Sequence, residues 1–199
     1  VGLILFTDEV EKYIPPRKGR FHVLRVIRDI LYHQPLRQGT DINEALQFLS
    51  RVTSHRAIAV VISDFIGQSA PTRKEMEAHL LREAVLSDVL KYASISALRQ
   101  AHRRHDVVAV QVMDRFELNL PPIGRVVLKD AETGQVMEVD TGDPRKRAAF
   151  ASKQKKAQRE LGRLFRSVGI DAIQLTTDEP YDLELAKFFE NREKRRARG

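Results

Sequence analysis

Oxygen-bearing side chains stand at the ends of several apolar runs of this 199-residue chain, where a strand would leave a sheet. The longest β-branched run, Ala57 to Ile62, ends in Ser63-Asp64-Phe65. Because its apolar residues do not alternate with polar ones, the run predicts a strand covered on both faces. Ligands of open α/β sheets bind at the carboxyl ends of parallel strands. Asp64 is therefore the first candidate for a functional site.

Other polar residues occupy comparable positions, namely Asp8, Thr40, Asp41, Asp114, Thr176, Thr177 and Asp178. If the strands run parallel, most of these oxygens gather along one edge of the sheet. Hydroxyl and carboxylate oxygens are the ligands that Mg²⁺ and Mn²⁺ prefer. The commoner meaning of such residues is local, with Thr40 and Asp41 capping a helix and Asp64 capping the next turn.

The hydropathy pattern alternates strands with helices, which predicts an α/β fold with a mostly parallel, doubly wound, Rossmann-like sheet. Strands are predicted at residues 1–6, 10–14, 57–62, 106–113 and 170–175, and an inserted β-hairpin joins 125–129 to 136–140 around 132–134. Helices are predicted at 20–32, 42–53, 72–104, 143–169 and 180–196. Helix 20–32 is expected to be amphipathic, with Val23, Leu24, Ile27, Ile30 and Leu31 at helical spacing. We expect a single domain over residues 1–190 and a basic tail over 191–199.

Composition limits the classes of function. The chain has no cysteine, which excludes disulfides and thiolate metal sites and fits a reducing compartment such as the cytoplasm. Six histidines are not spaced for zinc, and His102 and His105, at a helix end, are expected to be exposed. No run is long enough to predict a transmembrane helix, and no signal peptide is recognised.

Basic residues outnumber acidic ones by 34 to 27. Five basic residues and one acidic residue lie in 191–199, which leaves 29 and 26 elsewhere, so the tail carries much of the excess. A second basic run precedes Gly169 and comprises Lys153, Lys155, Lys156, Arg159, Arg163 and Arg166, with Glu160 as the acid nearby. Each run is either a partner-facing surface or, more commonly, a solvated helix face. Aromatic residues do not interleave with the tail, so no nucleic-acid binding is expected.

Short motifs in a fixed order point to a known family. They are Val1–Asp8, Tyr13–Arg20, Gly39–Ile42, Ile62–Phe65, Arg103–Val110 and Thr177–Tyr181. The chain resembles domain-of-unknown-function family 58, a bacterial von Willebrand factor A-like group associated with MoxR-type AAA+ ATPases. The resemblance departs only at about Gln68 to Ser96, where the helix is longer than the usual connection of the family.

The resemblance implies a metal-ion-dependent adhesion site (MIDAS) built from three loops. It assigns the metal-binding threonine to Thr40 and the metal-binding aspartate to Asp64, with Asp41, Ser63 and Phe65 as candidate partner-binding residues. The first loop, an Asp-x-Ser-x-Ser motif, and its strand would precede Val1. We therefore expect an N-terminally truncated fragment with a missing first strand, weak or absent binding of Mg²⁺ or Mn²⁺, and oligomerisation or strand swapping.

The expected function is a non-enzymatic, cytoplasmic protein-interaction module that acts as an accessory or chaperone-like partner of a MoxR-type AAA+ ATPase, without nucleic-acid or membrane contact. One alternative is a divalent-metal phosphoesterase or nuclease that uses Asp8, Asp41, Asp64 and Asp114, although no base stands out. Another is nucleic-acid binding through the basic tail. No nucleophile elbow or glycine-rich phosphate loop is present to indicate a hydrolase.

Overall fold

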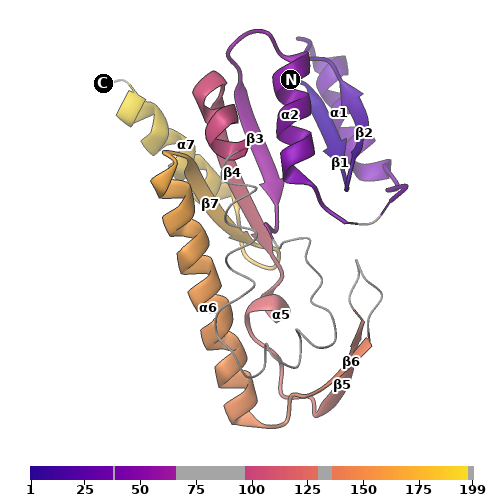
Figure 1. Ribbon diagram of the computed structural model, residues 1–199, viewed down its shortest axis with the longest axis vertical. Helices are drawn as coiled ribbons and strands as arrows, with labels where there is room; N and C mark the ends of the chain where they lie inside the picture. The colour runs from indigo at the N-terminus through magenta and orange to yellow at the C-terminus, as the bar shows by residue number, and fades with distance from the viewer. Residues whose placement is uncertain (38, 66–96, 130–135, 197–199) are drawn as a thin grey trace. The chain divides into compact units, whose positions relative to one another are not determined.

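The computed structural model describes residues 1–37, 39–65, 97–129 and 136–196 (Figure 1). These residues form a mixed α/β structure with a parallel three-strand sheet and two antiparallel hairpins. The chain divides into two compact units. Of the described residues, 1–37, 39–57, 97–106 and 129 belong to the first unit, and 58–65, 107–128 and 136–196 belong to the second. Each unit is described by itself.

The first unit contains a hairpin and two helices that follow it in the chain. Strand β1 (Leu3–Phe6) pairs antiparallel with β2 (Val10–Ile14), and Leu3 lies opposite Ile14. Helices α1 (Arg20–Tyr32) and α2 (Ile42–Val52) follow, and residues 97–104 are also helical. The Tyr13 ring of β2 meets the Phe48 ring of α2 edge-on at 5.3 Å. These elements confirm the two strands and two helices predicted for residues 1–53.

Helix α1 buries a different side from the one that its apolar spacing predicts. Exposed fractions of Leu24, Ile27, Ile30 and Leu31 lie between 46% and 72%. The buried residues of α1 are instead Val26 and Asp29. The Asp29 carboxylate pairs with the Lys12 ammonium of β2 at 3.4 Å, and an ion pair of this kind can set the orientation of the helix on the hairpin. The predicted helix is therefore confirmed, and among the described residues its apolar side is largely exposed.

The second unit is built on a sheet with the strand order β3-β4-β7. Its strands are β3 (Ile58–Ser63), β4 (Asp106–Met113) and β7 (Asp171–Thr176), and β4 pairs with β7 in parallel from Val108 opposite Asp171 to Met113 opposite Thr176. Helices α6 (Pro144–Ser167) and α7 (Asp182–Arg196) lie beside this sheet (Figure 1). The unit also contains the short helix α5 (Arg115–Leu118) and the hairpin of β5 (Arg125–Lys129) and β6 (Val136–Asp140).

Most elements predicted beyond residue 57 are confirmed. Helix α6 ends at Ser167, and Val168 separates it from Gly169, whose φ of 76° suits glycine. Helix α5 was not predicted. Most of the predicted helix 72–104 and the hairpin turn 132–134 lie outside the described residues. The prediction of a single domain over 1–190 stays a prediction. Among the helices of the described ranges, none combines the length and the apolar character needed to cross a membrane.

Strand β4, rather than β3, is buried on both faces. Val107, Val108 and Ala109 have exposed fractions of 0%. In β3, by contrast, Ile58, Val60 and Ile62 are 60%, 46% and 62% exposed and alternate with half-buried residues. The prediction that strand 57–62 is covered on both faces is wrong, because β3 is an outer strand of the described sheet. An uninterrupted apolar run does not by itself distinguish an outer strand from an inner one.

Candidate functional site

In the second unit, the carboxyl ends of the parallel strands bring several predicted oxygen ligands to one edge. Asp64 follows β3, Asp114 follows β4, and Thr177 follows β7. The Thr177 hydroxyl donates to Asp114 Oδ2 at 3.2 Å. The Asp178 carboxylate pairs with Arg115 at 3.2 Å. The expected gathering of strand-end oxygens is therefore confirmed for the three strands of this unit.

Asp64 is held in place through its neighbours. Its carboxylate Oδ1 accepts a hydrogen bond of 3.3 Å from the Ser63 hydroxyl. Its main-chain oxygen accepts one of 3.0 Å from the side-chain amide of Gln111, a buried residue of β4. The Gln111 side-chain oxygen in turn accepts from Gln174 of β7 at 2.8 Å. A chain of amides that crosses all three strands thus fixes the end of β3.

Phe65 turns the backbone immediately after Asp64. Its φ of 55° lies in the left-handed region, which bulky residues seldom occupy and which the surrounding contacts must maintain. Two contacts do so: the Phe65 N–H donates to the Ser63 hydroxyl at 3.0 Å, and the Phe65 ring meets the Phe165 ring edge-on at 5.0 Å. The ring of this candidate partner-binding residue is therefore used in packing against α6.

In the first unit, the loop Gly39-Thr40-Asp41 lies against the turn that follows β1. The Asp41 N–H donates to the Thr7 main-chain oxygen at 2.6 Å. A Cβ added to Gly39, whose φ is 98°, would lie 3.8 Å from the Asp8 Cβ. Asp41 caps α2, because its Oδ1 accepts from the N–H groups of Asn43 at 2.8 Å and Glu44 at 3.0 Å. The local capping role considered for Asp41 is therefore confirmed.

The two predicted metal ligands lie in different units. Thr40, a half-buried residue, belongs to the first unit with Asp8 and Asp41, whereas Asp64 belongs to the second with Ser63. Their hydroxyl and carboxylate oxygens suit Mg²⁺ or Mn²⁺. Within the described ranges, however, no three or more carboxylates or imidazoles are grouped as a metal would require. The donor types therefore suit such an ion, and each of the two groups is described within its own unit.

Glu11 organises the first unit in a way that the sequence does not indicate. Its carboxylate lies 2.7 Å from the His33 ring nitrogen and accepts from the Thr7 hydroxyl at 2.9 Å. The N–H groups of Leu36 and Arg37 also donate to it, at 3.0 and 3.1 Å. Burial raises the pKa of Glu11, but these hydrogen bonds lower it, and the pKa lies below its usual value. In sequence, Glu11 is only one of the two polar residues of the strand predicted at 10–14, beside Lys12.

His105 is buried, with an exposed fraction of 1%, which contradicts the expectation that it is exposed. It follows the last turn of helix 97–104, where its N–H donates to the Ala101 oxygen, and it leads into the buried strand β4. Within the described part of the chain, neither ring nitrogen has a hydrogen-bond partner. Burial, and secondarily the charge of Arg104, lowers the pKa of His105. Its position between a helix and an interior strand explains why helical spacing alone led to the wrong prediction that its side chain is exposed.

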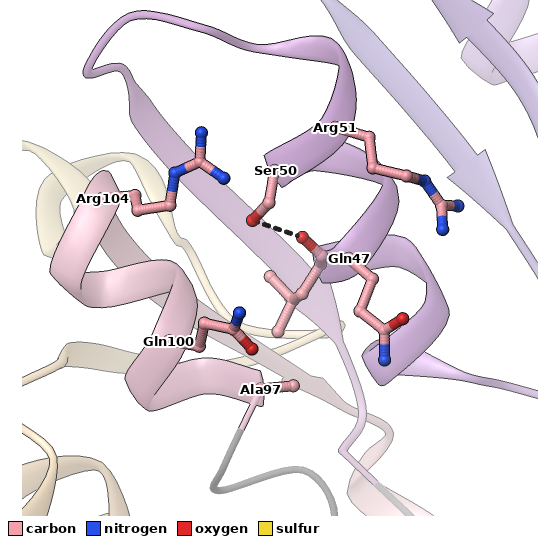
Figure 2. Close-up of a pocket in the computed structure, with 7 residues that line it drawn as sticks. Gln47, Ser50, Arg51, Ala97, Gln100 and Arg104 are labelled. Atoms are coloured by element: carbon pink, nitrogen blue, oxygen red, sulfur yellow. Dashed lines mark hydrogen bonds between the residues drawn. The ribbon is translucent and has the colours of Figure 1, made fainter.

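A cavity of about 340 Å³ in the first unit lies between α2 and helix 97–104 (Figure 2). It is lined by Leu46, Gln47, Ser50, Arg51, Ala97, Gln100 and Arg104. Figure 2 shows Arg104 reaching toward α2 while Arg51 and Gln47 extend away, so the cationic groups do not converge. Arg51 pairs with Glu44 at 2.8 Å, and Ser50 donates to the Leu46 oxygen at 3.0 Å. These described lining residues include no carboxylate or imidazole that could act as a base.

A parallel sheet with polar loops at its carboxyl edge places the chain among α/β proteins whose sites lie at strand ends. Residues 1–160 match the family described as "Protein of unknown function DUF58", and the chain belongs to that family. An uncharacterized protein of Mycobacterium avium is 30% identical over 181 residues, which cover 90% of this chain and 93% of that protein.

Uncharacterized proteins of Mycobacterium tuberculosis and Mycobacterium bovis are 28% identical over 194 residues, which cover 96% of this chain and 54% of each relative. The chain thus spans about half the length of these curated relatives. No solved structure matches the chain significantly.

Proposed function

We propose that the chain is a non-enzymatic protein-interaction module with a von Willebrand factor A-like fold and a remnant metal-ion-dependent adhesion site. In this proposal, Thr40 and Asp64 contribute oxygens to one Mg²⁺ or Mn²⁺ ion. The partner is a cytoplasmic MoxR-type AAA+ ATPase, for which the module serves as an accessory or chaperone-like factor. Membership of the family rests on the match over residues 1–160.

The observation that carries the proposal is the fixed position of Asp64 at the carboxyl end of β3. Ser63 donates to its carboxylate, and Gln111 holds its main-chain oxygen from the neighbouring strand. A carboxylate that is held both at its own oxygen and at its main-chain oxygen is pre-organised for coordination, because little freedom is lost when an ion binds. The motifs Gly39-Thr40-Asp41 and Ser63-Asp64-Phe65 support the same assignment through the resemblance to von Willebrand A-like domains.

A bound Mg²⁺ would supply a hard Lewis-acid position that accepts a carboxylate oxygen of a partner. The residues of this chain orient the site. Asp64 provides a carboxylate, Thr40 provides a hydroxyl, and the Phe65 ring locks the turn between the strand and the loop. Because the described residues supply only part of a shell, the proposal requires further ligands from outside them.

A hydrolytic role gains no comparable support. Asp41 and Asp114 each use a carboxylate oxygen to cap a helix, α2 and α5 respectively. Arg37 lies beside Asp8, with 3.6 Å between their charged groups. These three carboxylates therefore have local structural roles, and a phosphoesterase would still need a base.

The test measures binding of the complete protein to a MoxR-type AAA+ ATPase from the same genome, by surface plasmon resonance with Mg²⁺ or with EDTA. We expect EDTA and Asp64→Ala each to weaken binding at least about tenfold, which corresponds to about 1.4 kcal/mol. Asp178→Ala is the matched control, because it removes a carboxylate from the same edge of the sheet, and it should leave binding unchanged. Equal affinity with and without Mg²⁺ would contradict the proposal, as would equal losses in both variants.

A further inference from the structure

Helix α6 holds an unusual concentration of positive charge. Between Pro144 and Ser167 it carries nine basic residues and one acidic residue, Glu160. The whole chain has 34 basic and 27 acidic residues, so 25 basic and 26 acidic residues lie outside α6. The net charge of the chain, +7, is therefore smaller than the net charge of this helix, +8, and the residues outside α6 together carry −1.

Most of these basic residues share one side of the helix. At 3.6 residues per turn, six of them fall within an arc of about 100°. We call this set the basic stripe, and it consists of Arg145, Lys155, Lys156, Arg159, Arg163 and Arg166. From Lys155 to Arg166 the stripe runs about 16 Å along the helix axis. It contains no acidic residue, since Glu160 lies outside the arc.

The basic stripe is exposed, and the part of the fold that the structure describes does not use it. All six residues are exposed, and within the described ranges their side chains make no ion pair or hydrogen bond. Arg147, on another side of α6, behaves differently, because it donates to the main-chain oxygens of Thr141 and Gly142 at 2.7 and 3.0 Å. Like charges three or four residues apart, such as Arg159 and Arg163, disfavour a helix. A local structural role therefore does not account for the stripe.

We infer that the basic stripe is a docking surface for an acidic helical segment of a partner protein. The inference deepens the proposed function and rests on it, since it names a second surface of the same interaction module. Four of the six residues are arginines, whose planar guanidinium groups pair with carboxylates in a bidentate geometry. A helix with Glu or Asp at every third or fourth position presents a matching row of carboxylates at the same spacing.

The composition of this face favours a protein over a nucleic acid or a membrane. The aromatic residues of α6, Phe150 and Phe165, are half-buried and buried, so they offer no platform for stacking unpaired bases. Between the charged residues the stripe contains only the small residues Ala148 and Ser152, which cannot anchor the helix in a bilayer. The stripe is also narrow, as expected for contact with one helix.

The experiment uses residues 1–199 and a fluorescent 20-residue Ala/Glu peptide with glutamates on one helical face, followed by fluorescence anisotropy in EDTA at about 50 mM salt. We expect the triple variant Arg159→Gln, Arg163→Gln, Arg166→Gln to weaken binding at least about tenfold. The matched control, Arg20→Gln, Arg99→Gln, Arg103→Gln, removes the same charge from exposed residues of the first unit and should weaken binding less than about twofold. A peptide of equal charge with its glutamates scattered around the helix should bind more weakly.

Equal losses in the two triple variants, or equal affinity for the two peptides, would overturn the inference, because binding would then report net charge alone. Tighter binding of a 20-base-pair DNA duplex or of phosphatidylserine vesicles that depends on the same three arginines would also overturn it. Circular dichroism confirms that the variants fold. Because EDTA removes divalent metal, a failure of the metal-dependent interaction leaves this result unaffected, and the two proposals can be judged separately.

Discussion

The imidazole of His105 lies in the interior of the first unit without a hydrogen-bond partner in the described part of the chain. Because burial lowers its pKa, the folded chain binds fewer protons than the unfolded chain as the pH falls below the ordinary value of 6.5. The free energy of unfolding should therefore decrease between about pH 7.5 and pH 5.5. His105→Leu should reduce this decrease, as measured by urea denaturation at the two pH values.

The carboxylates of Glu11, Asp29 and Asp171 should not contribute to the change in the free energy of unfolding over this pH range. Hydrogen bonds and neighbouring cations hold their pKa values below the ordinary values despite the opposing effect of burial, so their contributions are lost only at a lower pH. His22→Leu is a suitable control, because His22 is half-buried and belongs to another helix. An identical pH dependence in the wild type and His105→Leu would contradict the assignment.

Asp41 stabilises helix α2 as its N-cap residue. Asp41→Ala removes the acceptor for the Asn43 and Glu44 N–H groups and should destabilise the protein by about 1 kcal/mol. Asp41→Ser keeps a capping oxygen and should lower the free energy of unfolding by only about a few tenths of a kcal/mol. Thermal denaturation measures both changes. Equal destabilisation by Ala and Ser would show that the cap is not the stabilising contact.

Helix α7 contacts the sheet through arginines that the sequence places in a basic tail. Residues 191–196 continue α7, and Arg192, which is 7% exposed, bonds the Asp171 carboxylate of β7 at 2.8 Å. Arg195 bonds the same carboxylate at 2.9 Å. Arg192→Ala should therefore destabilise the protein by about 2 kcal/mol in chemical denaturation.

Lys194→Ala is the control on the same helix. Among the residues that the structure describes, Lys194 pairs with exposed Glu190 alone, at 3.6 Å, so its removal should cost less than about 0.5 kcal/mol. If both substitutions cost the same, Arg192 does not anchor α7. The arginines that bond Asp171 are also less able to bind phosphate, which weakens the alternative of nucleic-acid binding through the tail.

At the scale of the whole molecule, the sequence predicted element types better than burial. The β-branched composition of β4 and the Asp143-Pro144 start of α6 are local signals, and both elements are confirmed. Which face is buried depends on tertiary partners that local spacing does not contain. That dependence explains the errors at β3 and His105 and the exposed apolar side of α1. It also explains why the hydrogen bond between Glu11 and His33 was not foreseen.

The candidate site was predicted in part for the same reason. The ends of strands can be recognised in the sequence, so Asp64, Asp114 and Thr177 were predicted as candidate site residues. The structure places them at the carboxyl edge of the three-strand sheet. The support of Asp64 by Gln111 was not foreseen, because a polar residue inside a buried strand has no local signature of its partner. The assignment of Thr40 as a metal ligand depends on the family resemblance.

The proposed function requires that Thr40 and Asp64 bind the same ion. Paramagnetic broadening of ¹H–¹⁵N spectra of the complete protein by substoichiometric Mn²⁺ is a direct measurement of this shared binding. We expect the amide signals of Thr40, Asp41, Asp64 and Phe65 to broaden together and to recover when excess Mg²⁺ is added, and we expect Asp64→Ala to abolish both effects. Broadening confined to one of the two loops, or broadening that persists in Asp64→Ala, would contradict the shared site.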